Sequence, residues 1–291
     1  MTVKAILAAA SGGTASAGAV ELACRFAQRF NAHVEGFHAK PDPFDLVKYD
    51  AAMGASVLTD AFIKRFTADA DANAAKVRNE FAAALQRHGM DLSRHAPNEL
   101  QGQIGGSAVW REVVGYGPTL VARRARFFDL VVLGRSERVI ENPHSDAVEQ
   151  TLLQSGRPVV LAPAKAPEAI GDRIALGWNG SAAAVRAMIG VLPFLAAAES
   201  VVIISIGEMH QSSAKSALDY LAWHDVKAKQ VHVPTVTGAS AGQQLLSTAR
   251  DEGADLLAMG GYGHTPWREF FFGGATRDII GVSLLPLLLT H

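Results

Sequence analysis

The sequence has a single cysteine, few aromatic residues and no concentration of charge of either sign. Cys24 alone cannot form an internal disulfide framework, so the chain fits a reducing compartment. The formal net charge is −1 over 291 residues, and no block of lysine and arginine stands out. Because a phosphate-backbone partner would need a concentrated basic face, the sequence does not favour nucleic-acid binding.

Long apolar runs are also missing. The first apolar run, residues 5–10, is interrupted at once by Ser11-Gly12-Gly13, so it is too short for a secretory leader or a membrane span. No other stretch reaches about 18 consecutive apolar residues. Hydrophobic residues still make up 49% of the chain, enough to bury sizeable cores. We therefore expect a cytoplasmic protein of two domains, without membrane association.

Apolar segments of strand length alternate with helical patterns, which is typical of parallel βαβ units. Residues 5–9 lead into Ser11-Gly12 and a helix over about 17–30, and residues 173–177 lead into Asn179-Gly180 and a helix to about 195. Two later strands match in the same order, residues 129–134 with 255–260 and residues 157–161 with 285–289. Three matched strands indicate an internal duplication.

The predicted fold class is α/β, with two tandem doubly wound parallel-sheet domains at residues 1–165 and 170–291. A Pro- and Ala-rich linker joins them. Continuous apolar strands of this kind are covered by helices on both faces. The spacing also predicts a long helix over about 57–88, with a shorter equivalent over about 212–224, and places Trp110 in a strand that contributes to the core.

The stretch after Gly260 is the richest in glycine. Further glycines follow at 263, 273 and 274, before a helix predicted over about 276–282. Glycine lets backbone N–H groups approach phosphate oxygens, and a helix N-terminus adds free donors. The stretch matches neither a P-loop nor a Rossmann fingerprint. Since glycines are also common at turns, geometry alone leaves phosphate binding and ordinary turns both open.

The spacing Gly260-x2-Gly263-x9-Gly273 resembles the ATP-binding signature of the universal stress proteins. The segment Trp178-Asn179-Gly180-Ser181, at the end of the second half's first strand, is also similar to that family. The resemblance covers nearly the whole chain as two copies. It implies adenine-nucleotide α-hydrolase-like domains and a stress-response or signalling role. It also implies ATP, ADP or AMP as the ligand, which Mg²⁺ could accompany.

The resemblance implies a nucleotide site at the carboxyl edge of the second half. Asn179 and Ile206 would contact the base, and Met259 and Gly260 would line the base and ribose. His264 would pair with a phosphate when protonated, or would be a solvated loop histidine. The implied site consists of Asn179, Ile206, Met259, Gly260, Gly263, His264, Gly273, Gly274 and Ala275.

Two of these positions depart from the pattern. Asn179 stands where ATP-binding members carry Asp, and its amide can still offer a donor and an acceptor to the adenine edge. Gly274 stands where those members carry a Ser or Thr that contacts phosphate. The second change puts triphosphate affinity in doubt more than base recognition.

The first half departs further. Glu137 stands where Gly263 lies in the second half, and Ser145-Asp146 replaces Gly273-Gly274. Two carboxylates facing phosphates would repel them in a partly dry site. We therefore predict that this copy does not bind nucleotide. A divalent cation bridging Glu137, Asp146 and a phosphate is the alternative.

No catalytic set can be assigned. There is no Gly-x-Ser-x-Gly elbow, and His210, His224 and His232 lack metal-ligand spacing. The sequence thus predicts a binding module rather than an enzyme, with weak ATP hydrolysis at most. The alternatives are an interaction protein with a vestigial site and a slow ATPase. Because apolar edge strands promote association, we expect strands 159–161 and 287–289 to pair as an intrachain pseudo-dimer, with a homodimer left open.

Overall fold

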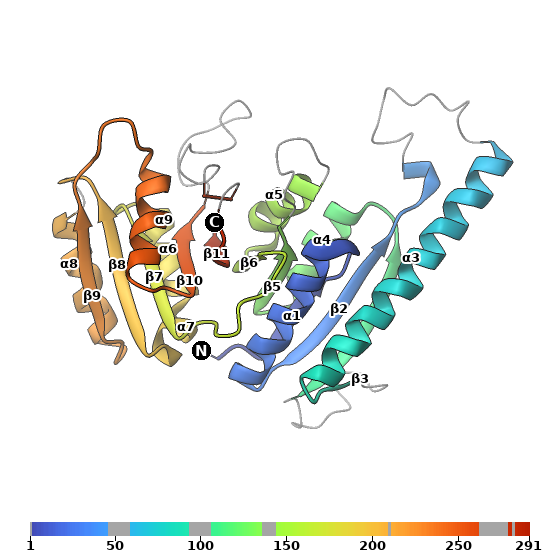
Figure 1. Ribbon diagram of the computed structural model, residues 1–291, viewed down its shortest axis with the longest axis horizontal. Coiled ribbons are helices and arrows are strands. Elements are labelled where there is room, and N and C mark those ends of the chain that lie inside the picture. The colour runs from blue at the N-terminus through green and yellow to red at the C-terminus, as the bar shows by residue number, and fades with distance from the viewer. Residues whose placement is uncertain are drawn as a thin grey trace.

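The structure, a computed structural model, describes residues 2–45, 59–92, 106–135, 144–208, 211–261, 279–280 and 283–291. Within these residues, eleven strands form one continuous sheet that runs across the molecule (Figure 1). The first half contributes β1 (Ala5–Ala9), β2 (His33–Lys40), β3 (Asp91–Leu92), β4 (Ser107–Val114), β5 (Leu130–Gly134) and β6 (Val159–Ala162). The second half contributes β7 (Arg173–Trp178), β8 (Ser200–Ile206), β9 (Ala228–Val233), β10 (Leu256–Gly260) and β11 (Leu287–Thr290).

Helices cover both faces of this sheet, as expected for doubly wound α/β architecture. One buried cluster joins the sheet to α1 (Gly13–Phe30), α3 (Asp60–Arg87), α6 (Ala182–Gly190), α7 (Leu192–Ala197) and α8 (Gln211–Ala222). The other cluster joins the opposite face to α4 (Gly117–Ala125), α5 (His144–Ser155) and α9 (Ala241–Asp251). Each cluster contains residues of both halves.

The two halves meet through their last strands. Strands β6 and β11 pair antiparallel, with Leu161 opposite Leu287 and Val159 opposite Leu289. From this junction outward the strand order is β6-β5-β1-β2-β4-β3 on one side and β11-β10-β7-β8-β9 on the other. The predicted pairing of the two final strands within one chain is confirmed. It covers two apolar edges that would otherwise invite association.

Matching contacts recur at the same points of each half. The Asp129 carboxylate accepts hydrogen bonds from the N–H groups of Lys4 and Ala5 at the start of β1. The Asp255 carboxylate accepts from three consecutive N–H groups, beginning at Gly171, at the start of β7. In both halves an aspartate that precedes one strand therefore anchors the first residues of its neighbour.

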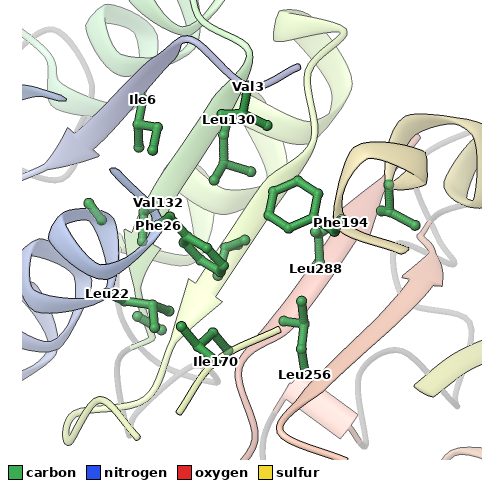
Figure 2. Close-up of a cluster of buried hydrophobic side chains, with 14 of the residues drawn as sticks. Val3, Ile6, Leu22, Phe26, Leu130, Val132, Ile170, Phe194, Leu256 and Leu288 are labelled. Carbon is green, nitrogen blue, oxygen red and sulfur yellow. The ribbon is translucent and has the colours of Figure 1, made fainter. Parts of the chain in front are cut away.

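Aromatic side chains fill the join between the halves. Phe194 of α7 lies edge-on to Phe26 and Phe30 of α1, with ring centroids 5.4 and 4.8 Å apart. Figure 2 shows Phe26 and Phe194 in one cluster with Leu288 of β11. The Arg29 guanidinium donates to the Asp172 carboxylate and to the backbone carbonyl groups of Ile170 and Gly171, at the start of the second half. The two halves therefore share a hydrophobic core and do not form two separately packed domains.

Several element boundaries differ from prediction. Helix α1 begins at Gly13, four residues before the predicted start at 17. The helix predicted to run to residue 195 is two helices, α6 and α7, which break at Val191. The reason is Pro193, which has no N–H for helical bonding and whose ring clashes with the preceding turn. Helix α3 is 28 residues long and matches the long helix predicted there.

Two further predictions concern single side chains. Cys24 is a buried residue of α1, as expected, and burial raises the pKa of its thiol to about 12. Trp110 lies in β4 as predicted and packs, partly buried, against the core. Of the described helices, none is both long and apolar enough to span a lipid bilayer.

Candidate functional site

The carboxyl ends of β10, β7 and β8 lie side by side in the second half. The chain leaves β7 for β8 on one side and later returns to β10 on the other, so the strand order reverses beside β7. Ligands of open α/β sheets bind at such a switch point, beyond the carboxyl ends of the strands. The structure brings Asn179, Ile206, Met259 and Gly260 together at this edge. The other five implied site residues, Gly263, His264, Gly273, Gly274 and Ala275, lie outside the described residues.

Asn179 follows β7 in a tight polar turn. Its Oδ1 accepts hydrogen bonds from the backbone N–H of Ser181 at 3.1 Å and from the Ser181 hydroxyl at 2.6 Å. Ser181 caps α6, because its Oγ accepts from the Ala184 N–H at 3.2 Å. The Asn179 oxygen is therefore engaged, and its exposed amide nitrogen is the group able to donate to a ligand.

The turn is backed by α8. Gly180 has φ of 68°, and a Cβ there would lie 2.9 Å from Ser213 Oγ. The same hydroxyl accepts a hydrogen bond from Trp178 Nε1 at 3.1 Å. A glycine is thus required here for conformation as well as for space. Gly180 was part of the segment that resembles the family motif. Ser213, which lies 33 residues further along the chain, was in no motif, so the sequence did not predict this contact.

Gly260 has a packing role. A Cβ at this position would lie 2.7 Å from both the backbone carbon and oxygen of Ala183, in the first turn of α6. Gly134, at the matching strand end of the first half, would bring a Cβ within 2.3 Å of the Ala15 carbonyl oxygen. The first glycine of the motif is therefore explained in both halves by the close approach of a helix to the strand end.

Ile206, Met259 and Gly261 can contribute mainly through their backbones. The Met259 side chain is 8% exposed and packs in the core, and Ile206 is partly buried against the same cluster. The Gly261 N–H already donates to the Thr290 carbonyl at 2.8 Å, which extends the β10–β11 ladder. The Gly261 N–H is therefore already used within the sheet and is not free to donate to a phosphate.

A histidine that the motif did not indicate lies near this edge. His232 of β9 has Nδ1 3.4 Å from Ser205 Oγ and Nε2 3.6 Å from the Glu208 carboxylate. Ser205 is fully buried, so its hydroxyl cannot reach a ligand as a nucleophile. No group of three or more His, Cys, Asp or Glu side chains suited to a metal occurs among the described residues.

The first half has the same edge with different chemistry. His38 of β2 is 1% exposed, and its Nδ1 donates to the Ala10 carbonyl at 2.6 Å, directly beyond β1. Asp146 lies in the first turn of α5. Glu137 falls outside the described residues, so the predicted carboxylate pair stays a prediction.

Neither a family model nor a curated protein sequence matches this chain. Solved structures do match it. A universal stress protein from Archaeoglobus fulgidus DSM 4304 is similar over 100% of this chain and 99% of its own, with a TM-score of 0.73 and 13% identity. A provisionally named universal stress protein from Pseudomonas aeruginosa UCBPP-PA14 covers 99% of this chain and 93% of its own, with a TM-score of 0.53 and 12% identity. A protein of unknown function from P. aeruginosa PAO1 covers 99% and 92%, with a TM-score of 0.53 and 13% identity. The chain has the fold of the universal stress proteins.

Proposed function

We propose that this protein is a tandem universal stress protein that binds ATP or a related adenine nucleotide in its second half and acts as a stress-response or signalling module. The observation that carries the proposal is the position of Asn179 and Gly260. They lie at adjacent strand ends, at the point where the strand order reverses. The glycine spacing that continues beyond Gly260 supplies the expected phosphate loop.

The proposal includes two domains, at residues 1–165 and 170–291, of which the first does not hold nucleotide. Glu137 and Asp146 would repel phosphates there unless a cation such as Mg²⁺ bridged them. A cytoplasmic location, and a homodimer built on the intrachain pseudo-dimer, belong to the same proposal.

The first test is to identify what the purified protein carries. The full chain is denatured, and the released small molecules are separated and identified. We expect an adenine nucleotide in a ratio near one per chain. Protein that carries none, and that binds none of ATP, ADP or AMP when they are added, would overturn the proposal.

Two observations favour a second candidate function, an interaction protein with a vestigial site. A side chain at position 260 would clash with the backbone of Ala183, and the Gly261 N–H already donates within the sheet. Both features would persist without a ligand. Identifying the small molecules released from the denatured protein distinguishes the two candidate functions, because a vestigial site would carry no nucleotide.

A nucleotide bound here should turn over slowly. Hydrolysis needs a positioned water and donors that stabilise charge developing at the γ-phosphate, and the sequence contains no assignable catalytic set. We therefore expect a rate far below the roughly 1–10³ s⁻¹ common for enzymes. Phosphate release in the presence of Mg²⁺ measures it, and several turnovers per second would make the protein an ATPase.

A further inference from the structure

Two buried ring nitrogens of the first half lack hydrogen-bond partners. His38 of β2 is 1% exposed, and its Nδ1 donates to the Ala10 carbonyl at 2.6 Å. Its Nε2 has no partner among the residues that the structure describes, and the buried Nε1 of Trp110, on β4, has none there either. Buried polar groups of native proteins nearly always have a partner, because leaving one unpaired costs its lost hydration. These two nitrogens therefore indicate a partner outside the protein chain.

The two nitrogens belong to neighbouring rings beneath α3. Gly36 of β2 lies opposite Trp110, and His38 is two residues further along, so both side chains are on the same face of the sheet. Their rings are nearly parallel, with an angle of 15° between them and centroids 6.0 Å apart. Phe81 of α3 packs against Trp110, with centroids 5.5 Å apart. Both nitrogens thus lie between the sheet and its covering helix.

The chemistry of the two rings limits what can bind them. An indole N–H can only donate, so the partner of Trp110 must carry an acceptor. Because Nδ1 of His38 already donates to a carbonyl, its Nε2 carries a lone pair in the neutral ring and a hydrogen in the charged ring. A hydroxyl oxygen can accept from Trp110, and it can either donate to His38 or accept from it. A hydroxyl group therefore suits both nitrogens.

The charged groups nearby favour a neutral molecule over a phosphate. Lys40, at the end of β2, is paired with Asp71 of α3 at 2.7 Å and with Glu112 of β4 at 3.6 Å. Glu112 lies directly opposite His38 in the sheet. The one cation of this group is therefore shared by two carboxylates, which would repel a phosphate. The ligand that fits this position differs from the nucleotide proposed for the second half.

The second half has a hydroxyl at the matching position. The glycine turn after the first strand of each half meets one polar side chain of the covering helix, Asn73 in the first half and Ser213 in the second. In the second half the Ser213 hydroxyl accepts from the Trp178 indole N–H at 3.1 Å. Asn73 does not accept from Trp110, whose N–H has no partner in the described part of the chain. In the first half a ligand would thus replace the hydroxyl that Ser213 supplies.

We propose that the first half holds a small neutral ligand beneath α3, and that hydroxyl oxygens of this ligand pair with Trp110 Nε1 and His38 Nε2. Asn73, which is half-buried, brings an amide to the same side of α3. Two sources offer this chemistry, ordered water and a small organic alcohol. The site does not depend on nucleotide binding in the second half.

Solution NMR of the full chain tests the site through its indole protons, with glycerol as the alcohol probe. The signals of Trp110 and Trp223 are assigned from W110F and W223F, and Trp223, which is 82% exposed, is the control for bulk water. We expect the Trp110 indole proton to show a nuclear Overhauser effect with the sign of a long-lived neighbour, and Trp223 to show bulk water alone. An effect at the water frequency that persists in glycerol identifies ordered water. Its replacement by an effect to glycerol protons identifies a site for organic alcohols, and a Trp110 proton with neither effect would overturn the proposal.

A crystal structure of the full chain gives an independent readout, which decides if W110F does not fold. We expect a ligand or water oxygen within about 3.2 Å of Trp110 Nε1 and of His38 Nε2. Trp178 Nε1, the matched nitrogen of the second half, should keep Ser213 as its partner. Crystals in which the two nitrogens have no such oxygen, or in which a protein side chain supplies it, would contradict the site.

Discussion

At the scale of single residues, the most consequential charge is the buried carboxylate of Glu35. It is 1% exposed on β2 and accepts two hydrogen bonds of 2.6 Å from the Arg124 guanidinium of α4. Such a fork is among the stronger ion pairs in proteins. Arg111 also approaches Glu35, at 3.4 Å, but is half exposed.

The variant R124L should therefore leave Glu35 buried without its main partner and lower the free energy of unfolding by about 3 kcal/mol. R111L removes the exposed partner and should cost less than about 1 kcal/mol. Denaturant unfolding of both variants measures the difference. Equal losses would show that the arginines share the carboxylate evenly, contrary to this geometry.

Protonation of the buried His33 side chain should make the stability of the fold depend on pH. Burial lowers the pKa of His33, which is 4% exposed, so the folded chain resists taking up this proton. The unfolded chain takes it up near the usual value of about 6.5. Stability should fall as the pH drops below that value. Unfolding measured from pH 8 to pH 5 should show a shallower fall in stability for H33N than for wild type, and an equal fall would contradict the role of His33.

At the scale of elements, the glycines that end β5 and β10 allow the helices that follow β1 and β7 to approach. G260A would place a methyl group 2.7 Å from the Ala183 backbone, and such overpacking costs about 1–3 kcal/mol. G117A, whose Cβ would meet Ala39 at 3.6 Å, makes an ordinary contact and serves as the control. Thermal unfolding without nucleotide should show a loss for G260A and none for G117A. A neutral G260A would mean that Gly260 is retained for a ligand alone.

The sequence sufficed for the elements whose signals are local. Apolar runs identified three matched strands in each half, and their repeated order aligned the halves, whereas β2, β3 and β9 were not predicted. The break at Val191 could have been found from Pro193, which was visible in the sequence. The ion pair of Glu35 could not, because Glu35 and Arg124 are 89 residues apart along the chain and only the packing of α4 on β2 joins them. Likewise, spacing alone could not separate the packing role of Gly260 from a ligand role.

At the scale of the whole molecule, the sheet and both cores run through the join, so the halves should unfold together. Phe194 of the second half packs on Phe26 of the first. F194A should cost about 3–5 kcal/mol and weaken hydrogen-exchange protection in β1 and β8 alike. Loss of protection confined to β8 would show that the halves unfold independently.

If the proposed function is right, each chain binds one nucleotide, in the second half. The test is calorimetric titration of the full chain with ATP, alongside G263V and the matched first-half variant E137V. We predict a single site in wild type and in E137V, and none in G263V. ATP at about one hundred times its dissociation constant should then stabilise the wild type by about 2.7 kcal/mol. Two equal sites, or undiminished binding by G263V, would show that the second half is not the single nucleotide site.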